Sequence, residues 1–477
     1  MVGFGAPSQS KMRVHERDGL FGAGSGRKSN LVTRRTLGLG AIGAAAAGLR
    51  VSCLFGQSAK ATTNQRVETS PSDDDQKHRT AFRYIRPVGS GDRSGTDLHN
   101  AATLADINEM IQLAGPGGTV CLVADSGTYQ TTDSIAISHG GAPGRPVKIV
   151  GVDSAGKTAK ARILGTRTNP YPTTSREFAA MKHGTDVFRL KAGADHLYFS
   201  FLDFMNVGNG AFYVRANIAD LTLEDIVATN VRRFFERADN AESTIAGLTV
   251  RRVSVMGFSK SAFRLDYHTS NVLMEDVLGD SMRQDFDNFP EGVDLSGNVH
   301  DVVFRRCTMR NSQQTRGPDD FWNGDGFTSE WNTHNILFED CVASGNTDAG
   351  FDLKSNAVTL LRCKSFDNTA NFKLWGKENA VMQGCTSENP VHRGGNQNAR
   401  HLTAEGGANI LVKNCSFIDK NGDATVFHTE ANDKVQPPIG STITVVDSTA
   451  KSLGRLSFVD LRSRVSIDGI EQPYNGR

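Results

Sequence analysis

Three aspartates and a lysine recur at matching places in consecutive segments of this 477-residue chain. Asp325 stands in Asn-Gly-Asp-Gly-Phe, and Asp348 stands in Asn-Thr-Asp. Asp352 lies in Phe-Asp-Leu, and Lys373 takes the same place in the later Phe-Lys-Leu. Converging carboxylates are ligands for a hard cation such as Ca²⁺, and a neutral lysine beside them can act as a base. The simpler interpretation is an alternating charge stripe in which Lys373 pairs with Asp352 across neighbouring strands.

A short apolar segment that ends in cysteine repeats through the same region. The clear copies end 34, 22, 22 and 30 residues apart, at Cys307, Cys341, Cys363, Cys385 and Cys415. Weaker copies lie upstream at 221–225, 248–252 and 272–276. A constant unit with occasional extra length predicts identical coils with loops inserted at one corner. Because no unit can bury its apolar face alone, successive coils must stack into a continuous core.

The content of each repeat predicts an all-β parallel β-helix solenoid. Each unit has a β-branched strand, a turn rich in Asn and Gly, and a second short strand. Asn346 and Asn368 follow their cysteines at the same spacing, where a stacked asparagine ladder can satisfy turn backbone groups. The sequence lacks the helical half-repeat of a leucine-rich horseshoe and the longer blades of a propeller. Residues 104–114 have helical spacing and predict a cap for the N-terminal end, so we expect one β-helix domain over 81–477.

The N-terminal region predicts an exported protein. Two adjacent arginines precede an uncharged run, Thr36–Leu49, which is too short to span a bilayer, and small residues at Ala59–Ala61 suit a signal peptidase. The pattern resembles a twin-arginine signal peptide over 1–61, followed by a disordered linker over 62–80. We expect a periplasmic or extracellular monomer without stable membrane association after signal removal. Its repeat cysteines are expected to be buried, reduced thiols.

Charge is balanced globally but gathers locally. The formal net charge of +1 gives no global field that would favour nucleic acid or a membrane surface. When the coils are aligned, Phe and Leu point inward, so Asp352 and Lys373 point outward on adjacent coils about 4.8 Å apart. The same column continues backward through Thr328, Asp294 and Arg264. Three carboxylates on adjoining coils are unfavourable together unless a cation neutralises them.

Three motifs together resemble the family 9 pectate lyases: Asn-Gly-Asp-Gly-Phe at 323–327, Asn-Thr-Asp-Ala-Gly-Phe-Asp-Leu at 346–353, and Asn-Phe-Lys-Leu-Trp-Gly at 371–376. The resemblance implies a right-handed β-helix. It also implies that Asp325, Asp348 and Asp352 bind Ca²⁺ and that Lys373 is the catalytic base. Ala349 departs from the family pattern, because it stands where a further aspartate is expected. A water or substrate oxygen would then take the missing ligand position.

The activity implied by this resemblance is calcium-assisted β-elimination by a secreted polysaccharide lyase. The cation would bind the substrate carboxylate and acidify the C5 proton of a uronate, and Lys373 would remove that proton. The expected partner is an acidic, pectate-like polysaccharide. Candidate groups for holding the neighbouring uronates or stacking on a sugar are Lys354, Arg393, Arg400, His401 and Trp375.

Three alternative functions remain open at this point. A β-helical hydrolase would need paired carboxylates and a Gly-His-Gly element, and neither follows Asp325. A uronan C5-epimerase would share the proton abstraction and add a second acid/base group, for which His401 is the candidate. A non-catalytic β-helical glycan-binding or surface protein is favoured by Ala349.

Overall fold

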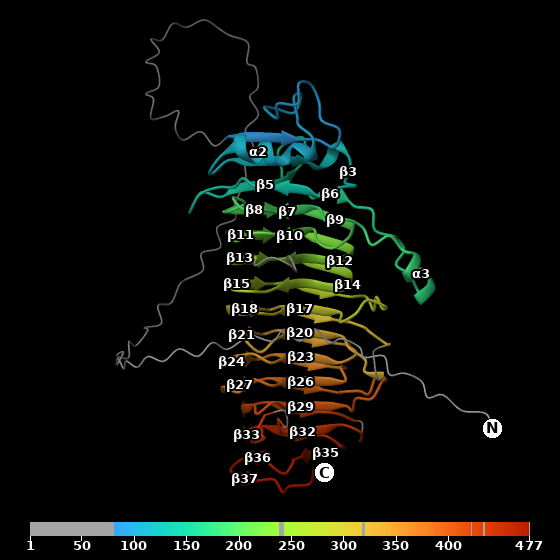
Figure 1. Cartoon of the computed structure of the whole chain (residues 1–477), viewed down its shortest axis with the longest axis vertical. Coiled ribbons are helices and arrows are strands. Elements are labelled where there is room, and N and C mark those ends of the chain that lie inside the picture. The colour runs from blue at the N-terminus through green and yellow to red at the C-terminus, as the bar shows by residue number, and fades with distance from the viewer. Residues whose placement is uncertain (1–80, 238–242, 317–319, 421, 433–434, 477) are drawn as a thin grey trace, which may run out of the picture. The chain divides into compact units, whose positions relative to one another are not determined.

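The computed structural model describes residues 81–237, 243–316, 320–420, 422–432 and 435–476. The predicted signal peptide and linker lie outside these residues. Within them the chain winds into a parallel β-helix, whose coils stack along one long axis (Figure 1). The predicted fold class is therefore confirmed. All named strand pairs in the described residues are parallel except β36–β37 at the C-terminal end.

Each coil contributes strands to three faces, and the first face is a sheet of 15 strands. In spatial order these are β1 (Phe82–Ile85), β2 (Thr119–Val123), β5 (Val147–Val152), β8 (Leu197–Ser200), β11 (Ile218–Glu224), β13 (Ile245–Arg251), β15 (Ser270–Glu275), β18 (His300–Arg305), β21 (His334–Glu339), β24 (Asn356–Leu361), β27 (Ala380–Gln383), β30 (Asn409–Lys413), β33 (Thr442–Val446), β36 (Arg464–Ile467) and β37 (Ile470–Glu471). The regular apolar segments of the sequence repeat form this face.

The second and third faces belong to one 22-stranded sheet, because the long strands β12 and β14 run along both of them. The second face contains β3 (Tyr129–Gln130), β6 (Ala161–Leu164), β9 (Leu202–Val207), β12 (Val227–Arg237), β14 (Ser254–Leu265), β16 (Leu278–Asp280), β19 (Thr308–Arg310), β22 (Val342–Ser344), β25 (Lys364–Phe366), β28 (Thr386–Glu388), β31 (Ser416–Ile418) and β34 (Thr449–Lys451). The third face adds β4 (Ile135–Ile137), β7 (Phe188–Leu190), β10 (Phe212–Val214), β17 (Glu291–Leu295), β20 (Asp325–Ser329), β23 (Ala349–Leu353), β26 (Ala370–Leu374), β29 (Arg400–Ala404), β32 (Thr425–Thr429) and β35 (Arg455–Phe458).

Like residues stack on like residues inside the coil. The rings of Phe327, Phe351 and Phe372 lie 4.9 and 5.2 Å apart from coil to coil. The repeat cysteines are buried free thiols, as predicted. This stacking fixes the register of the third face, because each phenylalanine is buried only when its strand aligns with its neighbours.

The turn between the second and third faces holds the predicted asparagine ladder. The Asn346 side-chain amide donates to the Asn368 side-chain oxygen at 2.8 Å, and the Asn368 amide donates to the Asn371 side-chain oxygen at 3.1 Å. The Asn346 oxygen also accepts the backbone N–H of Ser312 at 3.0 Å. These bonds satisfy buried turn groups and keep short coils tightly stacked.

The N-terminal end of the coil is covered by a helix, as the sequence predicted. A 3-10 turn, Leu104–Asp106, leads into α2, Ile107–Ala114, whose apolar side packs on β1 and β2. Ile107 and Ile111 are fully buried there. No helix in the described part of the chain is long and apolar enough to cross a membrane.

The extra lengths of the repeat lie at one corner, between the second and third faces. The connections β16–β17, β19–β20 and β28–β29 are long, whereas β22–β23 and β25–β26 are short. A further insertion between β6 and β7 contains α3, Ser175–Ala180, which projects from the side of the coil (Figure 1). The prediction of loops at one corner holds for these connections, whereas the long connection from β32 to β33 lies at another corner, between the third and first faces. The two short coils leave a recess on the third face between longer neighbours.

Candidate active site

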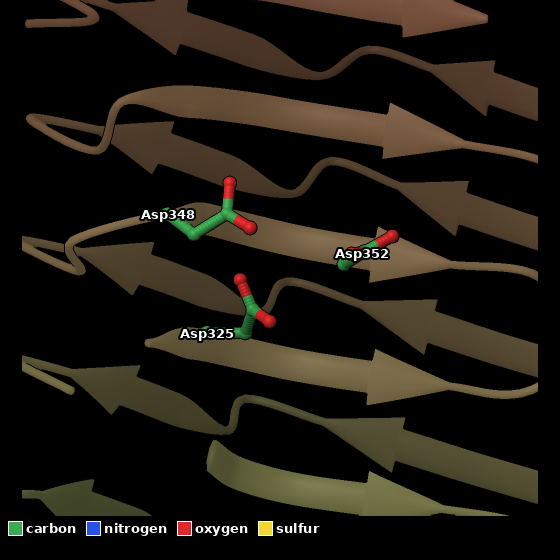
Figure 2. A group of neighbouring side chains, drawn as sticks. All are labelled: Asp325, Asp348 and Asp352. Atoms are coloured by element: carbon green, nitrogen blue, oxygen red, sulfur yellow. The ribbon is translucent and has the colours of Figure 1, made fainter. Parts of the chain in front are cut away.

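The three predicted aspartates converge on the third face. Asp325 opens β20, Asp348 immediately precedes β23, and Asp352 lies within β23 (Figure 2). Each offers a carboxylate oxygen that lies within 4.8 Å of the others, and all three side chains are buried. Asp325 Oδ1 accepts the backbone N–H of Ala349 at 2.7 Å, which fixes that carboxylate against the next coil.

Lys373 reaches the same cluster from the following coil. Its strand β26 pairs with β23 so that Lys373 lies directly beside Asp352, in the predicted register. The Nζ atom is 3.2 Å from Asp348 Oδ2 and 3.2 Å from Asp352 Oδ2. The side chain is 12% exposed, so it faces outward but is largely enclosed. The ion pair of the simpler interpretation therefore exists, although it belongs to a cluster with two further carboxylates.

The charges in this cluster do not balance. Burial raises the pKa of Asp325 well above its ordinary value, and Asp348 and Asp352 raise it further. Burial also raises the pKa of Asp348, although Lys373 opposes this. Burial alone would lower the pKa of Lys373, but Asp348, Asp352 and Asp325 together raise it well above its ordinary value. One lysine amine thus faces three carboxyl groups, and burial disfavours the charged forms of Asp325 and Asp348.

The donor set fits a hard divalent cation. All three candidate ligands are carboxylates, and Ca²⁺ takes six to eight oxygen ligands in flexible geometry. Ala349 leaves the remaining ligand positions to waters or to a substrate. Its place in the register is directly beside Asp325, since β20 and β23 pair with Phe327 opposite Phe351. An aspartate at 349 would have added a fourth carboxylate at that point.

Trp375 and Lys354 complete the floor of the recess. Trp375 Nε1 donates to Asp352 Oδ1 at 2.6 Å, and its ring lies 5.6 Å from Lys373 Nζ. Lys354 Nζ forms an ion pair with Glu330 Oε1 at 2.7 Å. Both residues line the cavity that contains Lys373. The indole therefore orients a candidate metal ligand besides offering a surface for a sugar ring.

Two inserted loops form one wall of this cavity, whose volume is about 410 Å³. The backbone N–H of Asn396 donates to the Asp320 carbonyl at 3.0 Å, and Gln397 Nε2 donates to the Trp322 carbonyl at 3.4 Å. The β19–β20 and β28–β29 connections thus touch each other across the short coils. Phe321, Asn323 and the 396–398 segment of these loops line the cavity.

Arg400 enters the cavity with two carboxylates that sequence reasoning did not single out. Its Nη1 is 3.6 Å from Glu405 Oε1, and its Nη2 is 3.4 Å from Glu430 Oε1. Burial raises the pKa of Glu405 to about 7. The register that pairs Lys373 with Thr403 extends to Glu405 beside Trp375, so repeat alignment carried the signal for this residue.

Thr403 is a second residue that sequence reasoning missed. It pairs with Lys373 on the outward column and lines the same cavity. Its buried hydroxyl oxygen has no hydrogen-bond partner in the described residues, and the same holds for Thr328 on the other side of Asp352. Buried hydroxyls without partners are unfavourable, and because Thr403 lines the cavity, its hydroxyl is available to a ligand or water there.

Two predicted substrate-binding residues lie elsewhere. His401 is fully buried between Ser387 Oγ at 2.8 Å and Asp419 Oδ2 at 2.8 Å, inside the coil rather than in the cavity. The Arg393 guanidinium donates to the Asp367 backbone carbonyl at the base of its loop. His401 lies within β29, where the four residues from His401 to Ala404 are all buried, so strand alternation alone does not show which of them face the cavity.

Comparison with known proteins supports the fold. No protein-family model and no curated protein matches the sequence. Among solved structures, the A-module of the mannuronan C-5 epimerase AlgE4 from Azotobacter vinelandii is similar with a TM-score of 0.52 and 12% identity, covering 80% of this chain and 100% of that module. Pectate lyase Pel9A is similar with a TM-score of 0.45 and 15% identity, covering 72% of this chain and 78% of that enzyme. The similarity to the AlgE4 module supports the β-helix fold of this chain.

Proposed function

We propose that this chain is an exported polysaccharide lyase that cleaves a uronate-containing glycan by calcium-assisted β-elimination. One observation carries the proposal: three buried carboxylates and one lysine amine converge in an open recess on the third face. A purely structural cluster would pair each acidic group with a cation, and this one places an excess of acidic groups, three carboxyls, against one lysine. Such an excess is typical of a site that awaits a cation.

The protein residues have distinct roles in this proposal. Asp325, Asp348 and Asp352 would hold the calcium ion. When bound, it would supply Lewis-acid chemistry that draws charge from the substrate carboxylate, acidifies the C5 proton and disfavours the ammonium form of Lys373. The neutral Lys373 amine then accepts the C5 proton. The loops at 320–323 and 396–398 enclose one side of the cavity and limit access of water.

The groups around this centre suit an acidic sugar. Arg400 and Lys354 bring positive charge to the cavity, and the Trp375 ring lies beside Lys373. Arg393 and His401 do not line the cavity that contains Lys373, so the proposal gives them no role at this centre. His401, the candidate second acid/base group of the epimerase alternative, is fully buried inside the coil. The names of the structurally similar proteins, a pectate lyase and a mannuronan epimerase, are consistent with a uronate substrate.

The test is the absorbance of the unsaturated uronate product. The chain without residues 1–61 is incubated with polygalacturonate or alginate, in calcium and in excess chelator. We expect product with calcium, and a loss of at least about 100-fold with chelator that added calcium reverses. Binding without product on either glycan would instead support a non-catalytic glycan-binding protein. Exchange of the C5 hydrogen without unsaturated product would support an epimerase.

A further inference from the structure

Glu405 is a second titratable group that faces the recess beside Lys373. It follows β29 directly, and its backbone N–H donates to the Leu374 carbonyl at 3.2 Å. This bond holds Glu405 beside Trp375, one coil beyond Lys373. The Glu405 side chain is 13% exposed and lines the same cavity as Lys373. The residue is therefore enclosed but remains open to a ligand in the recess.

The surroundings of Glu405 favour its protonated form. Burial is the main cause that raises the pKa of this carboxyl to about 7, and Glu430 on the next coil adds to the shift, whereas Lys373 and Arg400 oppose it. Arg400 is shared between the two glutamates at 3.6 and 3.4 Å. Glu430 also accepts a hydrogen bond from His428 Nε2 at 2.6 Å, which lowers the pKa of Glu430. The two neighbouring carboxyls therefore differ, and the protonated form is more favoured at Glu405 than at Glu430.

The other polar groups of the cavity are unsuited to donate a proton. Lys354 is held in its ion pair with Glu330. Arg400 carries a guanidinium, which does not give up its proton in this pH range. Glu430 is the carboxylate partner of His428 and Arg400. The Thr403 hydroxyl can donate a hydrogen bond but is far too weak an acid to give up a proton at neutral pH.

We propose that Glu405 is the general acid of the reaction and protonates the departing glycosidic oxygen. This proposal rests on the proposed lyase function. An elimination needs a base for the C5 proton and an acid for the leaving oxygen, and the cavity offers one group for each task on adjacent coils. General acid catalysis of this kind contributes about 10²- to 10⁴-fold in rate.

The protons moved in this step are supplied and accepted by Lys373, Glu405 and the substrate. The Lys373 amine takes the C5 proton and becomes an ammonium. The C5 electron pair forms the C4=C5 double bond, the C4–O4 bond breaks, and its electron pair stays on O4. Glu405 gives its proton to O4, which leaves as a hydroxyl, and becomes a carboxylate. Return of one proton from the Lys373 ammonium to the Glu405 carboxylate restores both groups without an external acid.

The test compares two readouts in Glu405→Gln and in the unaltered chain, in D₂O with calcium and with polygalacturonate or alginate. One readout is the unsaturated product, and the other is deuterium entering C5 of the uncleaved glycan, measured by mass spectrometry. We expect the variant to lose product formation by at least about 100-fold but to keep C5 exchange, because proton abstraction does not need the acid. Glu405→Asp, which restores a shorter acid, should recover part of the product.

The outcomes distinguish a failure of the general-acid role of Glu405 from a failure of the proposed lyase function. Glu388→Gln is the matched control, since Glu388 pairs with Lys364 on the second face, and it should leave both readouts unchanged. Product formation within threefold of normal in Glu405→Gln overturns the proposal. An equal loss of exchange and product also overturns it, since that indicates a positioning role. If the unaltered chain gives neither readout on either glycan, the lyase function itself fails.

Discussion

Two of the ionic clusters in the described residues, the arginine ladder and the aspartate cluster, differ in how their charges are paired. The arginine ladder, Arg252, Arg306 and Arg362, lies at the corner between the first and second faces. Each guanidinium bridges a Glu-Asp pair on the preceding coil; Arg306, for example, lies 2.7 Å from Asp276 and 2.9 Å from Glu275. The aspartate cluster, Asp325, Asp348 and Asp352, lies on the third face, and Lys373 is the only cation of the described residues within 4 Å of its carboxyl oxygens.

The pKa shifts separate the two clusters. Hydrogen bonds from the ladder arginines lower the pKa of Asp276 and of Asp340, so folding favours their charged forms. Burial and mutual repulsion raise the pKa of Asp325 and of Asp348, so folding disfavours the charged forms of these two residues. The ladder supports the fold, whereas the aspartate cluster costs the fold stability. Ionisable groups whose charged forms are disfavoured by folding are typical of functional sites, and the third face is where such a cluster lies.

The largest expected effect is the loss of activity in Lys373→Ala. Removing the only amine in the cluster removes the base, and we expect the rate of product formation to fall by about 10²- to 10⁴-fold. Lys373→Arg sharpens the test, because it keeps the positive charge while a guanidinium remains protonated at working pH. We expect both variants to be inactive in the absorbance assay with calcium. Activity in Lys373→Arg would show that the amine serves only to balance charge.

The sequence was sufficient for the fold because the repeat encodes packing directly. The spacing of the cysteines and of the inward phenylalanines determines the register, and the structure pairs Asp352 with Lys373 as aligned. The same alignment places Arg264, Asp294 and Thr328 on one outward column. Because the coils stack in register, a correct alignment of the repeats also predicts which residues are neighbours on adjacent coils.

The candidate site was harder to predict because sequence distance does not show which face a residue occupies. Arg393 and His401 follow Lys373 by about one coil, yet one lies at a loop base and the other inside the core. Glu405 was missed although the same repeat alignment places it beside Trp375. Its importance depends on burial and on sharing Arg400 with Glu430, which no local motif encodes.

A calcium-dependent change in stability is the next expected effect. Ca²⁺ at 100 times its dissociation constant should add about 2.7 kcal/mol to the free energy of unfolding. Asp325→Asn should weaken calcium binding by at least about tenfold, measured by calorimetry. It should also raise the melting temperature in chelator, because it removes a buried and repelled carboxylate. A lower melting temperature in chelator would contradict the charge imbalance of the aspartate cluster.

The pH dependence of that variant has a definite sign. A group whose pKa is raised by folding contributes stability at pH values below its ordinary pKa. This stability is lost as pH rises through the raised pKa. In chelator, the unaltered chain should therefore lose stability as pH rises, and Asp325→Asn should reduce this loss. Asp340→Asn is the matched control from the ladder, where the pKa is lowered. The stability that Asp340 contributes is present at pH values above its ordinary pKa and is lost as pH falls. Calcium binding by the Asp340→Asn variant should equal that of the unaltered chain.

The smallest expected effect is in Arg306→Met. Arg306 is half-exposed, so its ion pairs are screened by solvent and should contribute about 0.2–1 kcal/mol to the free energy of unfolding. Its backbone has a φ of 52°, and methionine keeps the strain of a non-glycine residue there, so the substitution isolates the charge. Urea denaturation at low and high salt should show a small loss that salt diminishes, with unchanged lyase activity. A loss above about 2 kcal/mol that salt does not reduce would mean that the arginine ladder stabilises the fold through packing. The ladder would then no longer serve as an example of charges that stabilise the fold by pairing.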